Sequence, residues 1–294
     1  MNKNGLIKGI VLLSILFCAT AAFAAGHGSK KEMKKGILLV AFGSSIPQAQ
    51  VAFENIEKNV KKAFTGIPVR WAYTSVIIRK KLKKQGKILD SVAMALAKMK
   101  DDGFTHVAVQ SLHTIRGEEF EDLEKTVYAF KYLPDGFTKV IVGAPLLSSQ
   151  NDIKKTADAI IANIPKTRKK NEAVVLMGHG SPHPSNAFYT ALMYNLQQHD
   201  KNIFVGTVEG APEIDDIIAM LKKAKIKKAY LMPFMSVAGD HARNDMAGDE
   251  ADSWKSILIK EGVKCEAVLK GTAEYNNMVA IWIDHLKGVV AHFK

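Results

Sequence analysis

Two histidines and a glutamate follow apolar, strand-like runs in the carboxy-terminal half of the chain. His179 lies between two glycines directly after one such run, and Glu209 and His241 follow the next two. Two imidazoles and a carboxylate suit a first-row divalent metal and leave coordination positions open for an incoming ligand. His183 is assigned to a loop, because its flanking prolines exclude a helix-borne pair with His179. We therefore predict a metal site at His179, Glu209 and His241.

A short motif pattern occurs twice in the chain. The paired segments are 36–45 with 173–182, and 109–119 with 231–241. The copies differ where chemistry would occur: His179 stands where the first copy has Phe42, and Glu119 stands opposite His241. Two similar halves with unequal chemistry across a cleft indicate an enzyme that handles one large ligand and a metal. Duplication alone would explain the repeat but not its unequal substitutions.

Further polar side chains occur close to the same motifs. Ser44, Ser45 and Ser181 are predicted to bind a substrate carboxylate; capping of the following helices is an equally weighted alternative. Arg79 and Arg116 could each bind a carboxylate through two parallel hydrogen bonds. We count Arg79 with the serines as a substrate-binding residue.

The segments that must hold these residues alternate between strand and helix patterns. Amphipathic stretches with helical spacing, such as 51–60 and 88–99, separate apolar, β-branched runs. The runs are 37–42, 69–73, 106–109, 140–142, 174–177, 203–207, 229–232 and 265–269. This alternation predicts an α/β fold with two similar doubly wound domains, each a four-stranded parallel sheet flanked by four helices. Ligands bind at the carboxyl ends of such strands, so the predicted site is the cleft between the halves.

The chain divides into a leader and two halves. Residues 1–25 have a basic start at Lys3 and Lys8, an apolar segment and small residues at the cleavage spacing, which predicts a cleaved secretory signal peptide and a periplasmic protein. An uncleaved anchor is the alternative. The predicted halves are 36–168 and 171–294, and a helix over 273–290 is expected to cross back over the first half. After signal removal we expect no stable membrane insertion.

Composition narrows the ligand class. The formal net charge is +12, and removal of Lys3 and Lys8 leaves +10. The lysines form short, scattered clusters without a nucleic-acid-binding module, so a polyanionic small molecule is the expected partner and nucleic acid is not. Removal of Cys18 leaves Cys265 alone, which excludes an intrachain disulfide.

Together these motifs resemble the anaerobic sirohydrochlorin cobaltochelatases of the CbiK type, which belong to the class II chelatases with ferrochelatase. The resemblance runs from Gly36 to the C-terminus. Its segments are Leu39-Val40-Ala41-Phe42-Gly43-Ser44-Ser45, Gln110-Ser111-Leu112-His113, Gly117-Glu118-Glu119, Met177-Gly178-His179-Gly180, Val208-Glu209-Gly210 and Met235-Ser236-Val237-Ala238-Gly239-Asp240-His241. Each segment is a weak signal alone, and their order and spacing make the resemblance specific.

The resemblance implies insertion of a divalent metal into sirohydrochlorin without ATP or another nucleotide. Co²⁺ is the implied substrate metal, and Fe²⁺ or Ni²⁺ would also suit the ligands. His179 and His241 would bind metal and accept pyrrole protons, Glu209 would be the third metal residue, and Glu119 or Glu118 would act from across the cleft. The eight carboxylates of sirohydrochlorin match the positive net charge. A homo-oligomer is a fair expectation for such a family.

Export is the departure from this pattern, because tetrapyrrole assembly for cobalamin is expected in the cytoplasm. The chief alternative is a periplasmic metal- or tetrapyrrole-binding protein that uses the same cleft without turnover. A metal-dependent phosphate esterase is the second alternative, but the sequence offers it neither a nucleophile nor a two-metal acid cluster.

Overall fold

The computed structural model describes residues 32–294, of which 33–294 form one compact unit. The predicted signal peptide and Cys18 lie outside the described residues. Within residues 32–294, no helix is both long enough and apolar enough to cross a membrane.

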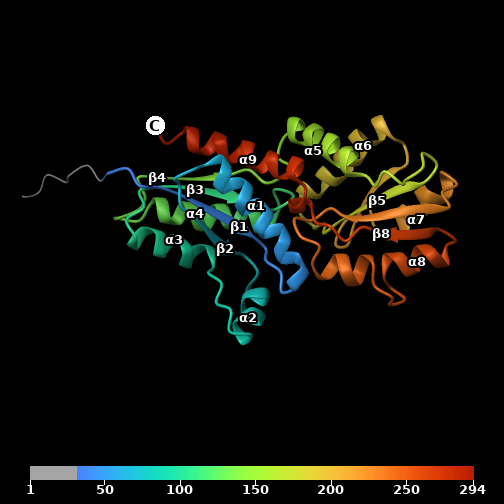
Figure 1. Cartoon of the computed structure of the whole chain (residues 1–294), viewed down its shortest axis with the longest axis horizontal. Helices are drawn as coiled ribbons and strands as arrows, with labels where there is room; N and C mark the ends of the chain where they lie inside the picture. The colour runs from blue at the N-terminus through green and yellow to red at the C-terminus, as the bar shows by residue number, and fades with distance from the viewer. Residues whose placement is uncertain (1–31) are drawn as a thin grey trace, which may run out of the picture. The chain divides into compact units, whose positions relative to one another are not determined.

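Two four-stranded parallel sheets form the framework of this unit (Figure 1). The first has the order β2-β1-β3-β4 and the second the order β6-β5-β7-β8. The strands are β1 (Lys35–Ala41), β2 (Val69–Tyr73), β3 (His106–Ser111), β4 (Lys139–Gly143), β5 (Ala173–Gly178), β6 (Ile203–Thr207), β7 (Lys228–Pro233) and β8 (Lys264–Ala267). All eight predicted strands are present, and the predicted fold class is confirmed.

The central strands of the sheets are buried on both faces. Every residue of β3 and β5 is buried, as expected for parallel strands covered by helices on both sides. In each sheet the chain runs from the first strand to one neighbour and then returns to the other side, so a switch point lies beside β1 and β3, and beside β5 and β7. Crevices at the carboxyl ends of such strands are where α/β sheets bind ligands.

Nine α-helices cover the sheets within the described residues. They are α1 (Gln50–Ala63), α2 (Val76–Lys84), α3 (Val92–Asp101), α4 (Glu118–Lys131), α5 (Gln150–Asn163), α6 (Ala187–His199), α7 (Ile214–Lys223), α8 (Trp254–Lys260) and α9 (Asn276–Ala291). Four of them begin at a serine whose hydroxyl accepts a hydrogen bond from the first turn, which satisfies a backbone N–H that the helix leaves unpaired.

Two details of the helix prediction are wrong. The first half contains an extra short helix, α2, which projects from the sheet in Figure 1. The helix expected over 88–99 begins only at Val92, because the Ser91 side chain caps it there by accepting from the backbone N–H of Met94. Ile88 lies before that cap and is 78% exposed, so it does not belong to the buried face.

Helix α9 returns to the first half, as predicted (Figure 1). It packs on β3, β4, α1 and α5, and its buried Trp282 belongs to a core that includes residues of both sheets. Helix α5 packs against α6 of the second half as well as against α9. The two halves therefore share one hydrophobic core.

A buried polar cluster fixes α9 in this position. His285 of α9 lies between two acceptors, with Nε2 2.9 Å from Asp152 Oδ1 and Nδ1 3.1 Å from the Ala144 carbonyl oxygen. The other Asp152 oxygen accepts hydrogen bonds from Ser148 and Ser149. Burial alone would raise the pKa of the Asp152 carboxyl, but the bonds from His285 and the two serines outweigh burial and lower that pKa.

We expect Asp152→Ala to lower the free energy of unfolding by about 3 kcal/mol at pH 7, because it leaves His285 without its buried partner. Since the folded-state pKa of Asp152 is depressed, its contribution is present above the unfolded pKa and is lost as pH falls through the folded pKa. Urea unfolding of wild type and variant should therefore converge in acid. Asp284→Ala, which breaks an exposed pair between α9 and Lys155, should change stability by less than about 1 kcal/mol. Equal effects of the two substitutions would contradict this assignment.

Candidate functional site

Three predicted residues lie at the carboxyl ends of neighbouring strands in the second sheet. His179 directly follows β5, Glu209 follows β6 and His241 follows β7. The register pairs Gly178 with Thr207, so the ends of β5 and β6 are level. The backbone N–H of Glu209 donates to the His179 carbonyl oxygen at 2.8 Å, which joins the two loops. Strand ends thus bring together residues that are far apart in the sequence.

The two imidazoles are in contact. The ring centroids of His179 and His241 lie 4.9 Å apart, with an interplanar angle of 86°. His179 Nδ1 is 2.9 Å from the Gly180 carbonyl oxygen, and His241 Nδ1 is 2.5 Å from Asp245 Oδ2. Both of these partners can only accept, so in each neutral ring Nδ1 holds the hydrogen and Nε2 keeps a lone pair. The pair therefore offers two Nε2 atoms to a metal.

Gly180 is required at its position. Its φ of +82° is in the left-handed region, and a Cβ there would lie 2.6 Å from the Cβ of Thr207 and 2.9 Å from the backbone nitrogen of Gly210. The carbonyl that holds His179 Nδ1 belongs to this glycine. A glycine after His179 is thus a structural condition for the orientation of the imidazole.

The predicted three-residue ligand set is only partly assembled. Glu209 Oε2 lies 3.8 Å from His179 Nδ1, which is the nitrogen on the opposite edge of the ring from Nε2, and the carboxylate side chain is 58% exposed. Across residues 32–294, no group of three His, Cys, Asp or Glu side chains is placed to hold a metal ion. The geometry brings His179 and His241 together and leaves Glu209 beside them.

A second acidic group lies in the first half of the chain. Glu119, in the first turn of α4, accepts a hydrogen bond from the Thr74 hydroxyl, and its Oε2 lies 3.5 Å from His113 Nε2. Burial would raise the pKa of Glu119, but the nearby His113 imidazole and the hydrogen bond from Thr74 outweigh burial and lower that pKa. Of the two candidates Glu118 and Glu119, it is Glu119 that makes these contacts.

His113 is a further candidate residue, which the sequence prediction quoted only within a motif. It follows β3, the strand that in the first half corresponds to β7, and its side chain is 11% exposed. Ser111 Oγ accepts from the His113 backbone N–H and lies 2.8 Å from its Nδ1. A hydroxyl proton donated to Nδ1 leaves the hydrogen on Nε2, directed at Glu119. A histidine just after a buried strand was the available signal.

Two of the predicted substrate-binding serines form hydrogen bonds with backbone groups of their own loops. Ser44 is buried, and its Oγ accepts from the Ile46 backbone N–H at 3.2 Å. Ser181 Oγ accepts from the backbone N–H of His183 at 3.1 Å. Ser45 lies half-buried next to Ser44. Neither hydroxyl caps a following helix, because the 3₁₀ turns Pro47–Ala49 and Pro184–Asn186 have Ile46 and His183 at their N-caps. The observed hydrogen bonds of Ser44 and Ser181 instead hold the loops that precede those turns.

The two arginines differ in their availability. Arg116 donates two hydrogen bonds to Glu124, at 2.9 and 2.8 Å, and lies over the Phe120 ring, so it is already paired. Arg79 is half-buried in α2, and its buried Nε has no hydrogen-bond partner among the described residues. Of the two, Arg79 is therefore the arginine that no carboxylate of the described residues already pairs with.

His183 joins the two halves. Its Nε2 lies 3.2 Å from Glu121 Oε1 of α4, and its Nδ1 lies 2.9 Å from Ser185 Oγ. The loop assignment is correct, since His183 directly precedes a 3₁₀ turn, Pro184–Asn186. Its imidazole nevertheless spans from the second half to the helix that contains Glu119.

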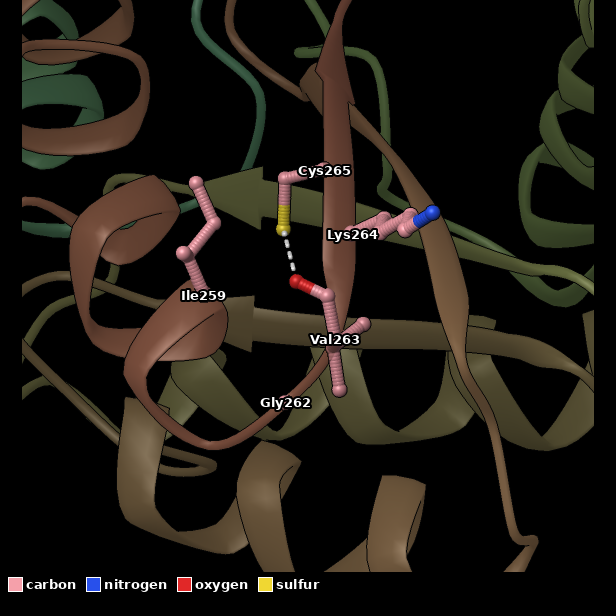
Figure 2. Close-up of a pocket in the computed structure, with 5 residues that line it drawn as sticks. All are labelled: Ile259, Gly262, Val263, Lys264 and Cys265. Atoms are coloured by element: carbon pink, nitrogen blue, oxygen red, sulfur yellow. Dashed lines mark hydrogen bonds between the residues drawn. The ribbon is translucent and has the colours of Figure 1, made fainter.

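A shallow pocket of about 440 Å³ lies elsewhere, beside the edge strand β8 (Figure 2). It is lined by Ile259, Gly262, Val263, Lys264 and Cys265. These residues lie around the amino end of β8, whereas the histidines follow the carboxyl ends of β5 and β7. Burial raises the pKa of the Cys265 thiol to about 11, so it is protonated at neutral pH and is a poor metal ligand. This pocket lacks the features of a catalytic site.

The two four-stranded parallel sheets flanked by helices have the fold of solved chelatases. SirB from Bacillus subtilis with Fe³⁺ has a similar structure, with a TM-score of 0.60, 18% sequence identity and an alignment that covers 88% of this chain and 97% of SirB. CbiX, described as the terminal enzyme for biosynthesis of siroheme in denitrifying bacteria, has a TM-score of 0.54 and 16% identity, with 86% and 98% covered. At these identities the likeness establishes the fold alone.

Sequence comparison identifies the family. The chain belongs to the cobalt chelatase (CbiK) family, whose model matches residues 35–291. It is 46% identical over 258 residues to a sirohydrochlorin cobaltochelatase, CbiKC, of Nitratidesulfovibrio vulgaris, covering 88% of this chain and 91% of that protein. It is 37% identical over 262 residues to a sirohydrochlorin cobaltochelatase of Salmonella typhimurium, covering 86% and 96%. The resemblance drawn from the motifs is thus confirmed at the level of the family.

Proposed function

We propose that this chain inserts Co²⁺ into sirohydrochlorin without ATP or another nucleotide. The observation that supports it most directly is the contact between His179 and His241, whose Nδ1 atoms are both engaged and whose Nε2 atoms are both left for a metal. Membership of the cobalt chelatase family supports the choice of metal and reaction class.

In this proposal the imidazole pair first holds the metal. Two neutral Nε2 donors suit Co²⁺, and they equally suit Fe²⁺ or Ni²⁺. Glu209 completes the set by turning about its side-chain torsions, which its exposure allows. The open coordination positions then face the pyrrole nitrogens of the macrocycle, so the ion can pass from protein ligands to the tetrapyrrole.

The proton balance fits two histidines. Metallation removes two N–H protons from the macrocycle as one dication enters. When the metal leaves His179 and His241, each Nε2 lone pair becomes available and can accept one of those protons. The same two atoms thus serve as ligands before the transfer and as bases after it.

Glu119 supports this step from the first half. Its lowered pKa keeps the carboxylate charged, which favours attraction of the incoming cation over uptake of a proton. The unpartnered Arg79 Nε, Ser45 and the positive net charge of the chain favour a ligand with many carboxylates. Sirohydrochlorin, with eight, is such a ligand.

We further propose that the reaction takes place in the periplasm. The sequence of residues 1–25 supports export and cleavage after Ala24 or Ala25. Mass spectrometry of the protein purified from a periplasmic extract would give a mature chain that begins at residue 25 or 26. Recovery of the full-length chain from the cytoplasm would refute export. A homo-oligomer remains the expected assembly.

The test of function is a spectroscopic assay of the mature chain with sirohydrochlorin and Co²⁺, Fe²⁺ or Ni²⁺ in separate reactions without nucleotide. We expect the macrocycle absorption to change to that of the metallated product, with a rate proportional to protein concentration. A carrier without turnover would bind Co²⁺ or tetrapyrrole in a stoichiometric amount and form no product above the rate without protein. That result would replace the enzyme by the periplasmic binding protein.

A further inference from the structure

An aspartate beyond the predicted ligand set contacts the metal-binding pair. Asp245 Oδ2 lies 2.5 Å from His241 Nδ1, four residues along the chain. The residues between them begin a π-helical turn, Ala242–Met246, that directly follows His241. Single π turns of this kind occur frequently at functional sites, where the wider turn redirects a side chain. The contact thus lies in an irregular turn of the backbone.

Buried apolar side chains fix the position of the π-helical turn. Ala242 and Met246 are fully buried, and Met246 packs in the cluster beneath α7 and α8. The backbone N–H of Arg243 donates to the Gly239 carbonyl oxygen at 3.2 Å. The Arg243 side chain donates from Nε to the Ala238 carbonyl oxygen. The same turn that buries these two apolar residues leaves His241 and Asp245 partly exposed on its other side. Packing therefore sets the positions of the aspartate and the imidazole together.

The two histidines are oriented by different kinds of acceptor. The Nδ1 of His179 is held by a backbone carbonyl, whereas that of His241 is held by a carboxylate. A carboxylate on the far nitrogen fixes the ring orientation and the tautomer, and makes the other nitrogen a stronger donor to metal. The strength of His241 as a metal ligand therefore depends on the Asp245 side chain, which can be replaced by mutation.

We propose that Asp245 is a positioning residue for the metal-binding step, holding His241 with its Nε2 lone pair toward His179. This inference rests on the proposed function for its purpose, but its physical content concerns the metal-free chain and its affinity for Co²⁺. Asp245 touches neither metal nor tetrapyrrole in this assignment and acts through His241 alone.

The experiment compares Asp245→Ala and the isosteric Asp245→Asn with wild type in two measurements. Long-range proton–nitrogen spectra of the metal-free protein report which His241 nitrogen holds hydrogen, and we expect Nδ1–H in wild type and its loss in Asp245→Ala. Titration with Co²⁺ without tetrapyrrole, followed by the Co²⁺ visible absorption, should give a dissociation constant 10- to 100-fold higher for Asp245→Ala. Asp245→Asn should fall between the two, because its amide keeps the size and one acceptor.

Asp249→Asn is the matched control. It removes the same charge four residues further on, where the side chain is exposed and pairs with Lys255, so it should leave the tautomer and the Co²⁺ affinity unchanged. Wild-type His241 in the Nε2–H form, or unchanged tautomer and affinity in folded Asp245→Ala and Asp245→Asn, would overturn the inference. If wild type forms no metallated tetrapyrrole while both readouts still depend on Asp245, the proposed function fails and the positioning role stands.

Discussion

Replacement of either His179 or His241 by alanine should lower kcat/KM for Co²⁺ insertion into sirohydrochlorin by at least about 100-fold, the lower bound for loss of a positioned base. Each substitution removes one of the two Nε2 atoms that the structure leaves available, so in the proposed mechanism it removes a ligand and a proton acceptor together. Because the rings act as a unit, the double variant should be little slower than either single variant. Initial rates over a range of Co²⁺ concentrations measure this.

His199→Ala is the control for these histidine variants. His199 is exposed at the end of α6, and its replacement should leave kcat/KM unchanged. Rates near that of wild type in both His179→Ala and His241→Ala would remove the mechanism. Strictly multiplicative losses in the double variant would instead mean that the two rings contribute independently.

Glu119→Gln should lower kcat/KM for Co²⁺ by about 100-fold, comparable to the loss of one preorganised electrostatic group. Glutamine keeps the size and the acceptor for the Thr74 hydroxyl but removes the negative charge. If the rate of Glu119→Gln is reduced at low Co²⁺ concentration and partly restored at high concentration, the role of Glu119 is to attract the cation. Glu118→Gln, at the exposed neighbouring position, is the control and should behave as wild type.

The pH dependence of the reaction tests the same group. The pKa of Glu119 is lowered, so its carboxylate stays charged in moderate acid, and its contribution is lost only as pH falls through that depressed value. Thr74→Val removes one of the hydrogen bonds that lower the pKa, so the acid limb of kcat/KM that Glu119 sets should move to higher pH. Thr126→Val, which removes a hydroxyl bonded to a backbone carbonyl within the same helix, should leave that limb in place. An acid limb that is identical in all three proteins would contradict this assignment.

The central strands were predictable because a parallel sheet covered by helices buries both of their faces. Run 174–177 is apolar throughout and run 203–207 is buried throughout, so their pattern has one good structural solution. Helix α2 was missed because it is short and highly charged, and its Ile77 is 77% exposed rather than part of a buried face. Its start depends on one serine cap at Ser75, which the spacing of apolar residues does not reveal.

The meeting of His179 and His241 was predictable for the same reason, since the carboxyl ends of neighbouring parallel strands lie at one edge of the sheet. The orientation of each ring was not, because it depends on acceptors that the sequence does not mark. Asp245 contacts His241 from within a π-helical turn, and the pairing of Arg116, which precedes α4, with Glu124 of α4 depends on side-chain directions. Glu209 was correctly assigned to a strand end, but the side of the imidazole that it approaches depends on its side-chain torsions.

The return of α9 to the first sheet has a consequence for how this protein is made. The amino-proximal sheet is complete in sequence by Gly143, yet part of the apolar layer that covers β3 and β4 comes from residues after 275. A nascent chain leaving the ribosome cannot close that surface until its final segment emerges, so contacts of very high sequence separation complete the fold last. Such a chain has a long interval in which holding chaperones can bind it before the fold is complete.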